Sequence, residues 1–210
     1  MEFIQKPMEI EERSMEIIAP HLDGLKLNEA ETKVYSRIIH AAGDVEYAPI
    51  IRLHPGAISA AMEALKSGCN IYTDVEMVRT GINKRKLESF GGKAFCRVAE
   101  PEIRVLAERE GITRSMAAMR SFGKELNGSI VAIGNAPTAL FEVLRLVNEE
   151  NIRPAVIVGI PVGFVGAADS KKELVENSIV PYITVEGTKG GSPIAAAAVN
   201  AIMYLIDNRR

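Results

Sequence analysis

The sequence has no tryptophan, and only 5% of its 210 residues are aromatic. Few side chains are therefore available to stack on nucleic-acid bases. The 25 lysines and arginines nearly balance the 27 aspartates and glutamates, so the formal net charge is only −2. A charge this small provides no global field to attract nucleic acid or anionic lipid. We therefore expect no nucleic-acid partner.

Cysteine and histidine are also scarce, with two and three copies. Cys69 and Cys96 stand far apart, without a companion Cys or His at metal-ligand spacing. The three histidines, His21, His40 and His54, are too few and too dispersed for a metal-dependent hydrolase. This pattern predicts neither a disulfide framework nor a metal site, and it is typical of a reducing, cytoplasmic compartment.

Long apolar runs are missing as well. Stretches such as 130–134 and 194–199 are far shorter than the roughly 20 residues needed to span a bilayer. The segment 1–5 has no basic region leading into an apolar one, so it does not have the pattern of a signal peptide. We expect a protein without membrane segments that stays in the cytoplasm.

What the sequence does have is enough apolar material for a core of its own. Apolar residues make up 47% of the chain, and no Pro/Ser-rich linker or internal repeat divides it. The prediction is one domain covering residues 1–210.

Stretches with helical and extended patterns alternate along the chain. Helices are predicted over 28–42, 55–67, 101–110, 113–126, 137–150, 170–179 and 192–204. Extended segments are predicted over 70–74, 93–98, 129–134, 155–159 and 182–185. Two of the helices are predicted to open with a capping box, Asn28 with Glu31 and Ser170 with Glu173.

Several of the extended segments are apolar on both faces and are separated by helices. This alternation predicts an α/β fold with an open, mainly parallel sheet of about five or six strands and helices on both faces. In such folds the functional crevice lies at the carboxyl ends of the strands. The last helix is apolar nearly all round, so we expect it to be either central or buried in a subunit interface.

Nucleotide-binding motifs are not matched. Gly159, Gly163 and Gly166 have the wrong spacing for the dinucleotide fingerprint. The turn 187–192 resembles a phosphate loop but lacks a Lys-Ser/Thr pair after its second glycine. An enzyme of the α/β class that uses a phosphate ligand stays open only as an alternative.

Of the three histidines, His40 is the most informative about function. On a helix from residue 28 it falls opposite the apolar stripe, on a face with Lys33 and Arg37. One interpretation is structural, because the last turn of a helix before Gly43 favours an imidazolium. The other is functional, because such an imidazole can act as an acid near neutral pH beside cations that bind carboxylates. His21 and His54 adjoin prolines and fit turn positions.

Other polar points fit an anionic ligand at the strand ends. Arg114 stands at a helix start beside free backbone N–H groups. Asn135 and Thr138 lie where a strand turns into a helix, and the next strand is followed by the glycine-containing, apolar segment 161–168. That segment could pack on a large flat ring. Each point taken singly also fits an ordinary capped helix start.

In several sequence runs the chain resembles the precorrin-8X methylmutases, which are isomerases of the cobalamin pathway. The resemblance extends over essentially the whole chain and rests on the runs 12–14, 37–43, 74–78, 113–115, 132–140 and 161–170.

This resemblance implies a specific reaction, in which a methyl group moves from carbon-11 to carbon-12 of precorrin-8X to give hydrogenobyrinate. The cobalt-containing analogue would give cobyrinate. It also implies a homodimer without an added cofactor, with His40 handling protons and with Ser14 and Arg37 contacting the substrate. We add Arg114, Asn135 and Thr138 as substrate-binding candidates from their positions at helix starts. A tetrapyrrole-binding protein without catalysis is a further alternative.

Overall fold

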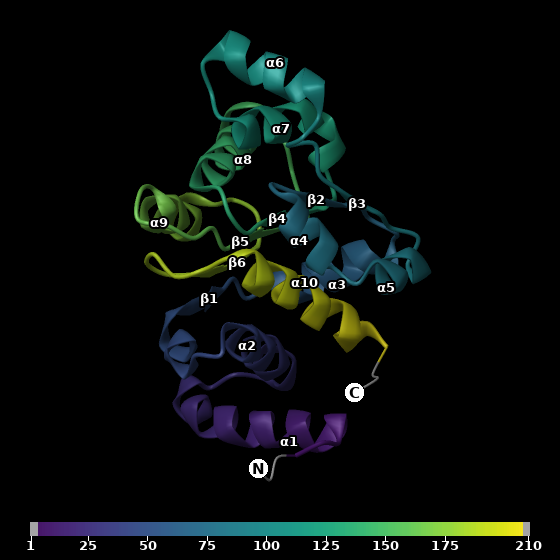
Figure 1. Ribbon diagram of the computed structural model, residues 1–210, viewed down its shortest axis with the longest axis vertical. Coiled ribbons are helices and arrows are strands. Elements are labelled where there is room, and N and C mark those ends of the chain that lie inside the picture. Colours follow the sequence, from purple (N-terminus) through teal and green to yellow (C-terminus); the bar gives the residue numbers. More distant parts are fainter. Residues whose placement is uncertain (1–3, 208–210) are drawn as a thin grey trace.

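Six strands form one sheet in the order β1-β6-β5-β4-β2-β3 in the computed structural model, which describes residues 4–207 (Figure 1). The strands are β1 (Ile51–Leu53), β2 (Ile71–Thr73), β3 (Ala94–Phe95), β4 (Ile130–Ile133), β5 (Val156–Gly159) and β6 (Tyr182–Val185). Only β1 runs antiparallel to its neighbour. The predicted open, mainly parallel sheet is therefore confirmed. The prediction for segment 1–5 rests partly on residues 1–3, which lie outside the described residues.

The central strands are buried on both faces because helices cover both sides of the sheet. Along β4, Ile130 and Ala132 belong to one apolar core, whereas Val131 and Ile133 belong to the other. This alternation follows from the two-residue period of a strand. It explains why the sequence of β4 is apolar throughout.

The helices form one layer on each face, with one further helix outside each layer (Figure 1). The first layer contains α2 (Glu29–Ala42), α3 (Ala57–Lys66), α4 (Glu76–Gly81), α5 (Lys84–Ser89) and α10 (Ser192–Ile206). The second contains α7 (Arg114–Phe122), α8 (Pro137–Glu149) and α9 (Ala167–Asn177). Outside these layers, α1 (Pro7–Ile18) packs on α2, and α6 (Pro101–Glu110) packs on α7. Short 3-10 helices are η1 (Ala19–His21), η2 (Asp23–Leu25), η3 (Val45–Ile50) and η4 (Gly123–Leu126).

The alanine-rich helix α10 is central. It packs against α2, α3 and α4 and against β4 and β5, which decides between the two positions expected from its sequence. Its polar residue Asn200 donates to the Gly81 carbonyl at 2.9 Å and accepts from the Asn83 N–H at 2.9 Å. The close approach of α4 also needs glycine at 81, because a Cβ there would lie 2.8 Å from Ala196. The small side chains of α10 therefore let neighbouring helices approach closely.

One predicted capping box is confirmed and the other is wrong. At α2, the Glu31 N–H donates to Asn28 and the Asn28 N–H donates to Glu31, both at 2.9 Å. The α9 helix instead begins at Ala167, and Ser170 lies inside it with its hydroxyl donating to the Ala167 carbonyl at 3.0 Å. Gly166 provides the N-cap because its φ of +77° lets the chain turn sharply into the helix.

None of the helices within residues 4–207 is both long enough and apolar enough to cross a membrane. Apart from the 3-10 helices, four elements within residues 4–207 were missing from the sequence prediction, namely α1, β1, α4 and α5. Of these, β1, α4 and α5 are three to six residues long, which is too short for a periodic apolar pattern.

Candidate active site

Two glycine-containing loops meet at the carboxyl ends of neighbouring strands. The first, residues 160–166, follows β5, and the second, residues 186–191, follows β6. The Gly163 N–H donates to the Thr188 carbonyl at 3.2 Å, and the Gly191 N–H donates to the Ile160 carbonyl at 3.0 Å. Gly190 has a φ of +157°, and a Cβ there would lie 2.5 Å from the Pro161 carbonyl oxygen. The two loops therefore form one connected surface at this edge.

Apolar side chains are exposed along the carboxyl edge of the sheet. Val162, Phe164 and Val165 all belong to the first loop, and Phe164 is 95% exposed. Met77 in the first turn of α4 and Phe95 at the end of β3 are exposed as well. The carboxyl edge thus offers apolar contacts suited to a flat, apolar ligand.

His40 is exposed in the last turn of α2, as its helical position predicts. The chain then turns at Gly43, whose φ is +63°, and Asp44 accepts a hydrogen bond of 2.6 Å from the Lys189 ammonium. Glu46 accepts another from the same ammonium at 2.9 Å. Because Lys189 belongs to the second loop, these contacts attach the end of α2 that carries His40 to the carboxyl edge of the sheet.

Arg37 lies three residues before His40 and forms an ion pair with Glu11 of α1. Ser14 lies on the same face of α1 as Glu11, and its hydroxyl donates to the Ile10 carbonyl at 2.8 Å. The structure therefore gathers the predicted Ser14 and Arg37 along the contact between α1 and α2, with His40 on the same helix as Arg37.

The predicted cationic face of α2 is partly neutralised. Arg37 has Glu11 as its partner, and Lys33 pairs with Glu29 at 2.8 Å. Sequence periodicity identified the shared face but not the acidic partners. Because both cations have acidic partners, this face of α2 carries less net positive charge than predicted.

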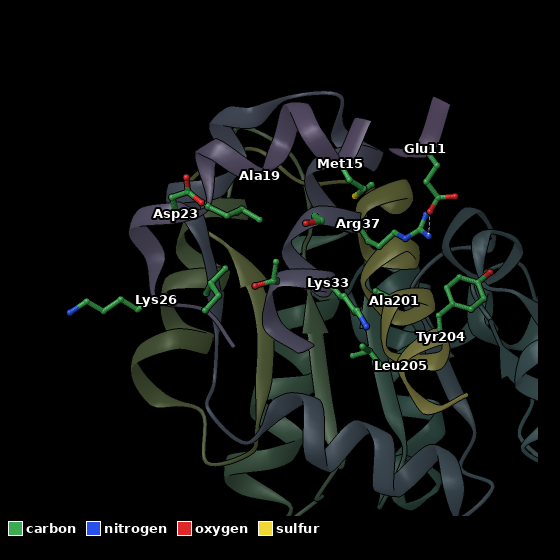
Figure 2. A pocket seen from close by; sticks show the side chains of 14 residues that line it. Glu11, Met15, Ala19, Asp23, Lys26, Lys33, Arg37, Ala201, Tyr204 and Leu205 are labelled. Carbon is green, nitrogen blue, oxygen red and sulfur yellow. Dashed lines mark hydrogen bonds and ion pairs between the residues drawn. The ribbon is translucent and has the colours of Figure 1, made fainter. Parts of the chain in front are cut away.

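A cavity of about 670 Å³ lies between α1, α2, η1, η2 and the end of α10 (Figure 2). Its apolar lining includes Met15, Leu22, Leu27, Ala201 and Leu205. Its charged lining residues are Glu11, Asp23, Lys26, Lys33 and Arg37. In Figure 2 the Arg37 side chain extends toward Glu11, and Lys26 points away from the others. His40 does not line this cavity, which follows the first turns of α2.

Arg114, Asn135 and Thr138 form a second group, at the start of α7 and α8. The Thr113 hydroxyl caps α7 and lies 2.9 Å from the Thr138 hydroxyl, while Arg114 and Asn135 are exposed. Helices α7 and α8 lie on the opposite face of the sheet from α2 (Figure 1). Arg114 also lines another cavity, of about 510 Å³, beside α6. The structure thus divides the predicted site residues into two groups.

Asp74, at the end of β2, was missed as a candidate. Its buried carboxylate accepts hydrogen bonds from the backbone N–H groups of Gly134 and Asn135 at 2.9 Å and of Ala136 at 2.7 Å. Burial raises the pKa of this carboxyl group, and the three donors act against that rise. These amides are therefore not free for a ligand. An acidic residue directly after an apolar strand was the available signal.

The cysteines are both free and half-buried. Burial raises the pKa of the Cys69 and Cys96 thiols to about 11. Within residues 4–207, no group of three or more His, Cys, Asp or Glu side chains is arranged to hold a metal ion.

Comparison with known proteins decides the family. The model of the family described as precorrin-8X methylmutase matches residues 9–205. This chain belongs to that family.

Relatives of this methylmutase cover most or nearly all of the chain. A cobalt-precorrin-8 methylmutase of Priestia megaterium is 40% identical over 203 residues, which are 97% of this chain and 90% of that protein. A precorrin-8X methylmutase of Pseudomonas aeruginosa is 44% identical over 81% of this chain and 82% of its own length. The solved precorrin-8X methylmutase of Thermus thermophilus has a TM-score of 0.85 at 34% identity, covering 95% of this chain and 98% of that chain.

Family membership makes the protein an isomerase of the precorrin-8X methylmutase type, in cobalamin biosynthesis. The resemblance seen in the sequence is thereby confirmed, as is the α/β fold class. The non-catalytic tetrapyrrole-binding protein and the phosphate-ligand enzyme are not favoured.

Proposed function

We propose that this methylmutase moves a methyl group from carbon-11 to carbon-12 of precorrin-8X or its cobalt-containing form, with His40 moving a proton on the ring. The observation that carries the proposal is the exposed imidazole at the end of α2, on the segment that Lys189 attaches to the carboxyl edge. Histidine is the side chain that gives and takes protons near neutral pH. By adding or removing a ring proton, His40 selects the tautomer from which the methyl shift proceeds. The methyl group stays on the substrate, so no added cofactor takes part.

Substrate binding uses charge and apolar surface together. The macrocycle is broad and apolar, and acetate and propionate groups surround it. Arg37 binds one of these carboxylates in place of Glu11, and the Ser14 hydroxyl turns from the Ile10 carbonyl to donate a hydrogen bond to the substrate from the neighbouring face of α1. Val162, Phe164 and Val165 provide apolar contact area for the ring.

The working unit is a homodimer in the cytoplasm. In one chain, His40 belongs to α2 on one face of the sheet, whereas Arg114 and Thr138 belong to α7 and α8 on the other face, and Asn135 lies in the turn that leads into α8. A second copy brings its Arg114 group to the His40 side of the first, so that each substrate is held by two chains. The exposed apolar residues of the carboxyl edge supply surface that such an arrangement buries.

The test is turnover of the purified protein with precorrin-8X and with its cobalt form, followed by the visible spectrum toward the corrin product. His40→Ala and His40→Asn should bind the substrate and leave its spectrum unchanged. His21→Ala is the matched control, because His21 is also exposed but lies in η1. A near-wild-type rate for His40→Ala would show that the catalytic assignment is wrong, and binding without conversion by the wild type would refute the activity.

A further inference from the structure

Lys171 of α9 is a lysine inside the protein, with 1% of its surface exposed. Its ammonium donates a hydrogen bond of 2.6 Å to the backbone carbonyl of Lys189. Within residues 4–207 it forms no ion pair with a carboxylate. A buried ammonium is costly unless it has compensating partners, so a fold without a use for it would be more stable with an apolar residue there.

The carbonyl that Lys171 binds lies in the middle of the second carboxyl-edge loop, residues 186–191. On either side of it, the Thr188 carbonyl accepts from Gly163 and the Gly191 N–H donates to Ile160. Lys171 thus adds a side-chain contact from α9 to the second loop, between the two backbone contacts that join this loop to the first. The loop contains Gly187, Gly190 and Gly191, all with positive φ, so its own backbone has little preference for one conformation.

The side chain of Lys189 extends the connection to α2. Its ammonium binds Asp44 at 2.6 Å and Glu46 at 2.9 Å, and it lies 5.4 Å from the centre of the Tyr47 ring. Asp44 follows the end of α2 and also accepts from the Glu46 N–H at 2.9 Å. A continuous series of contacts therefore runs from Lys171 through the backbone and side chain of Lys189 to the segment next to His40.

We infer that Lys171 is a positioning residue of the methylmutase: by holding the Lys189 carbonyl it fixes the loop whose Lys189 side chain places the His40 end of α2. This inference rests on the proposed role of His40. Lys171 itself is too deeply buried to touch substrate, and it acts only through Lys189.

The first test compares Lys171→Met with wild type in the full-length protein. Methionine has a similar length and no charge, so the protein should fold with an unchanged or higher midpoint of thermal unfolding. The kcat should nevertheless fall by about tenfold to a hundredfold, because small errors in position are expensive in catalysis. The KM should change much less. Lys171→Arg, which keeps N–H donors, should recover part of the kcat.

Lys172→Met is the matched control, because Lys172 is the next residue on α9 and is exposed, with its nearest carboxylate, Glu176, 4.0 Å away. Its kcat should equal that of the wild type. The imidazole NMR signals of His40, assigned by their loss in His40→Ala, should shift in Lys171→Met and stay in place in Lys172→Met.

Lys189→Met tests the contact of the Lys189 ammonium with Asp44 and Glu46, because this variant keeps the backbone carbonyl that Lys171 binds and removes the ammonium. If both lysines act in one series, the double variant should be no slower than the slower single variant. Wild-type kcat and unshifted His40 signals in Lys171→Met would overturn the inference, as would rate losses that multiply in the double variant. An active Lys171→Met beside an inactive His40→Ala would refute only this inference. An active His40→Ala would refute the proposed function, while the NMR comparison would still report on Lys171.

Discussion

The carboxylate of Asp74 accepts a hydrogen bond of 2.9 Å from the backbone N–H of Asn135, although 61 residues separate the two in sequence. Asp74 follows β2 and Asn135 follows β4, which is the parallel neighbour of β2. The amides of Gly134 and Ala136 donate to the same carboxylate. One buried side chain therefore determines the turn that leads from β4 into α8 and presents Asn135.

Replacement of Asp74 by asparagine should destabilise the protein by about 3 kcal/mol, because the new amide would direct N–H donors at backbone donors. Turnover should fall as well, since the turn carrying Asn135 would move. Urea unfolding and the spectral assay measure the two effects. Asp169→Asn is the control, since Asp169 is exposed in the first turn of α9. An unchanged unfolding midpoint for Asp74→Asn would contradict this account.

Arg37→Met should raise the KM by about tenfold or more and change kcat less, because the lost charge–carboxylate contact contributes to ground-state binding. Steady-state kinetics measure both constants. Arg13→Met provides the control, since Arg13 is an exposed arginine of α1 that pairs with Glu16 at 2.8 Å. Equal KM values for Arg37→Met and Arg13→Met would remove Arg37 from the substrate site.

Glu142→Gln should reduce the free energy of unfolding by about 3 kcal/mol, because it leaves two arginines without their buried partner. Glu142 is 1% exposed and accepts two hydrogen bonds of 2.9 Å from Arg120 and others from Arg145 at 2.7 and 3.1 Å. Burial works to raise the pKa of Glu142, but the two guanidinium groups hold it below 4.5. Its contribution should therefore be complete above pH 4.5 and be lost as the pH falls through the lowered pKa. Urea unfolding at several pH values tests this, with exposed Glu149→Gln as a control that should show little change.

The stability of the wild type relative to Lys171→Met should rise with pH. Burial lowers the pKa of Lys171 from 10.5 to about 8, so between these values the unfolded chain binds a proton that the folded chain has released. Stability increases with pH wherever the unfolded state binds more protons, here by up to about 3 kcal/mol across the interval. Tyrosines with raised pKa values act in the opposite direction, but they are common to both proteins and cancel in the difference. A difference that stays constant from pH 7 to pH 10.5 would contradict the assignment.

Co-expression of His40→Ala with Arg114→Ala should restore activity if each site is built from two chains. Random pairing makes half of the dimers mixed, and each mixed dimer has one intact site, so about a quarter of wild-type activity is expected. Each variant expressed alone should be inactive. If mixed dimers isolated by two affinity tags show no recovery of activity, either both residues belong to the site of the same chain or one of them is not part of the site.

Local sequence was sufficient for most of the fold. The capping box of Asn28 and Glu31 marked the start of α2, and Pro101–Glu110 and Tyr182–Val185 were predicted with the bounds that the structure has. These signals depend on residues a few positions apart, so they can be read without a fold. The predicted cap at Ser170 was wrong because Gly166, four residues earlier, is already the N-cap of α9, so that Ser170 lies inside the helix.

Local sequence predicted only part of the candidate site. The exposure of His40 follows from the period of one helix, so it was predicted. The pairing of Arg37 with Glu11, the contact of Lys189 with Asp44 and the turn held by Asp74 each join residues that are 26 to 145 positions apart. No local pattern identifies such partners.

By itself, the sequence determined the α/β class, the order of most helices and strands, the methylmutase resemblance and the outward face on which His40 lies. These follow from short-range periodicity, capping and motif spacing. Only the tertiary structure decided that Asp74 occupies the amides before α8, that Lys171 holds the Lys189 loop, and that the helices carrying Arg37, His40, Arg114 and Thr138 lie on two faces of the sheet. The reason is physical: parallel strands bring the ends of distant segments together, and the contacts made there depend on packing of the whole chain.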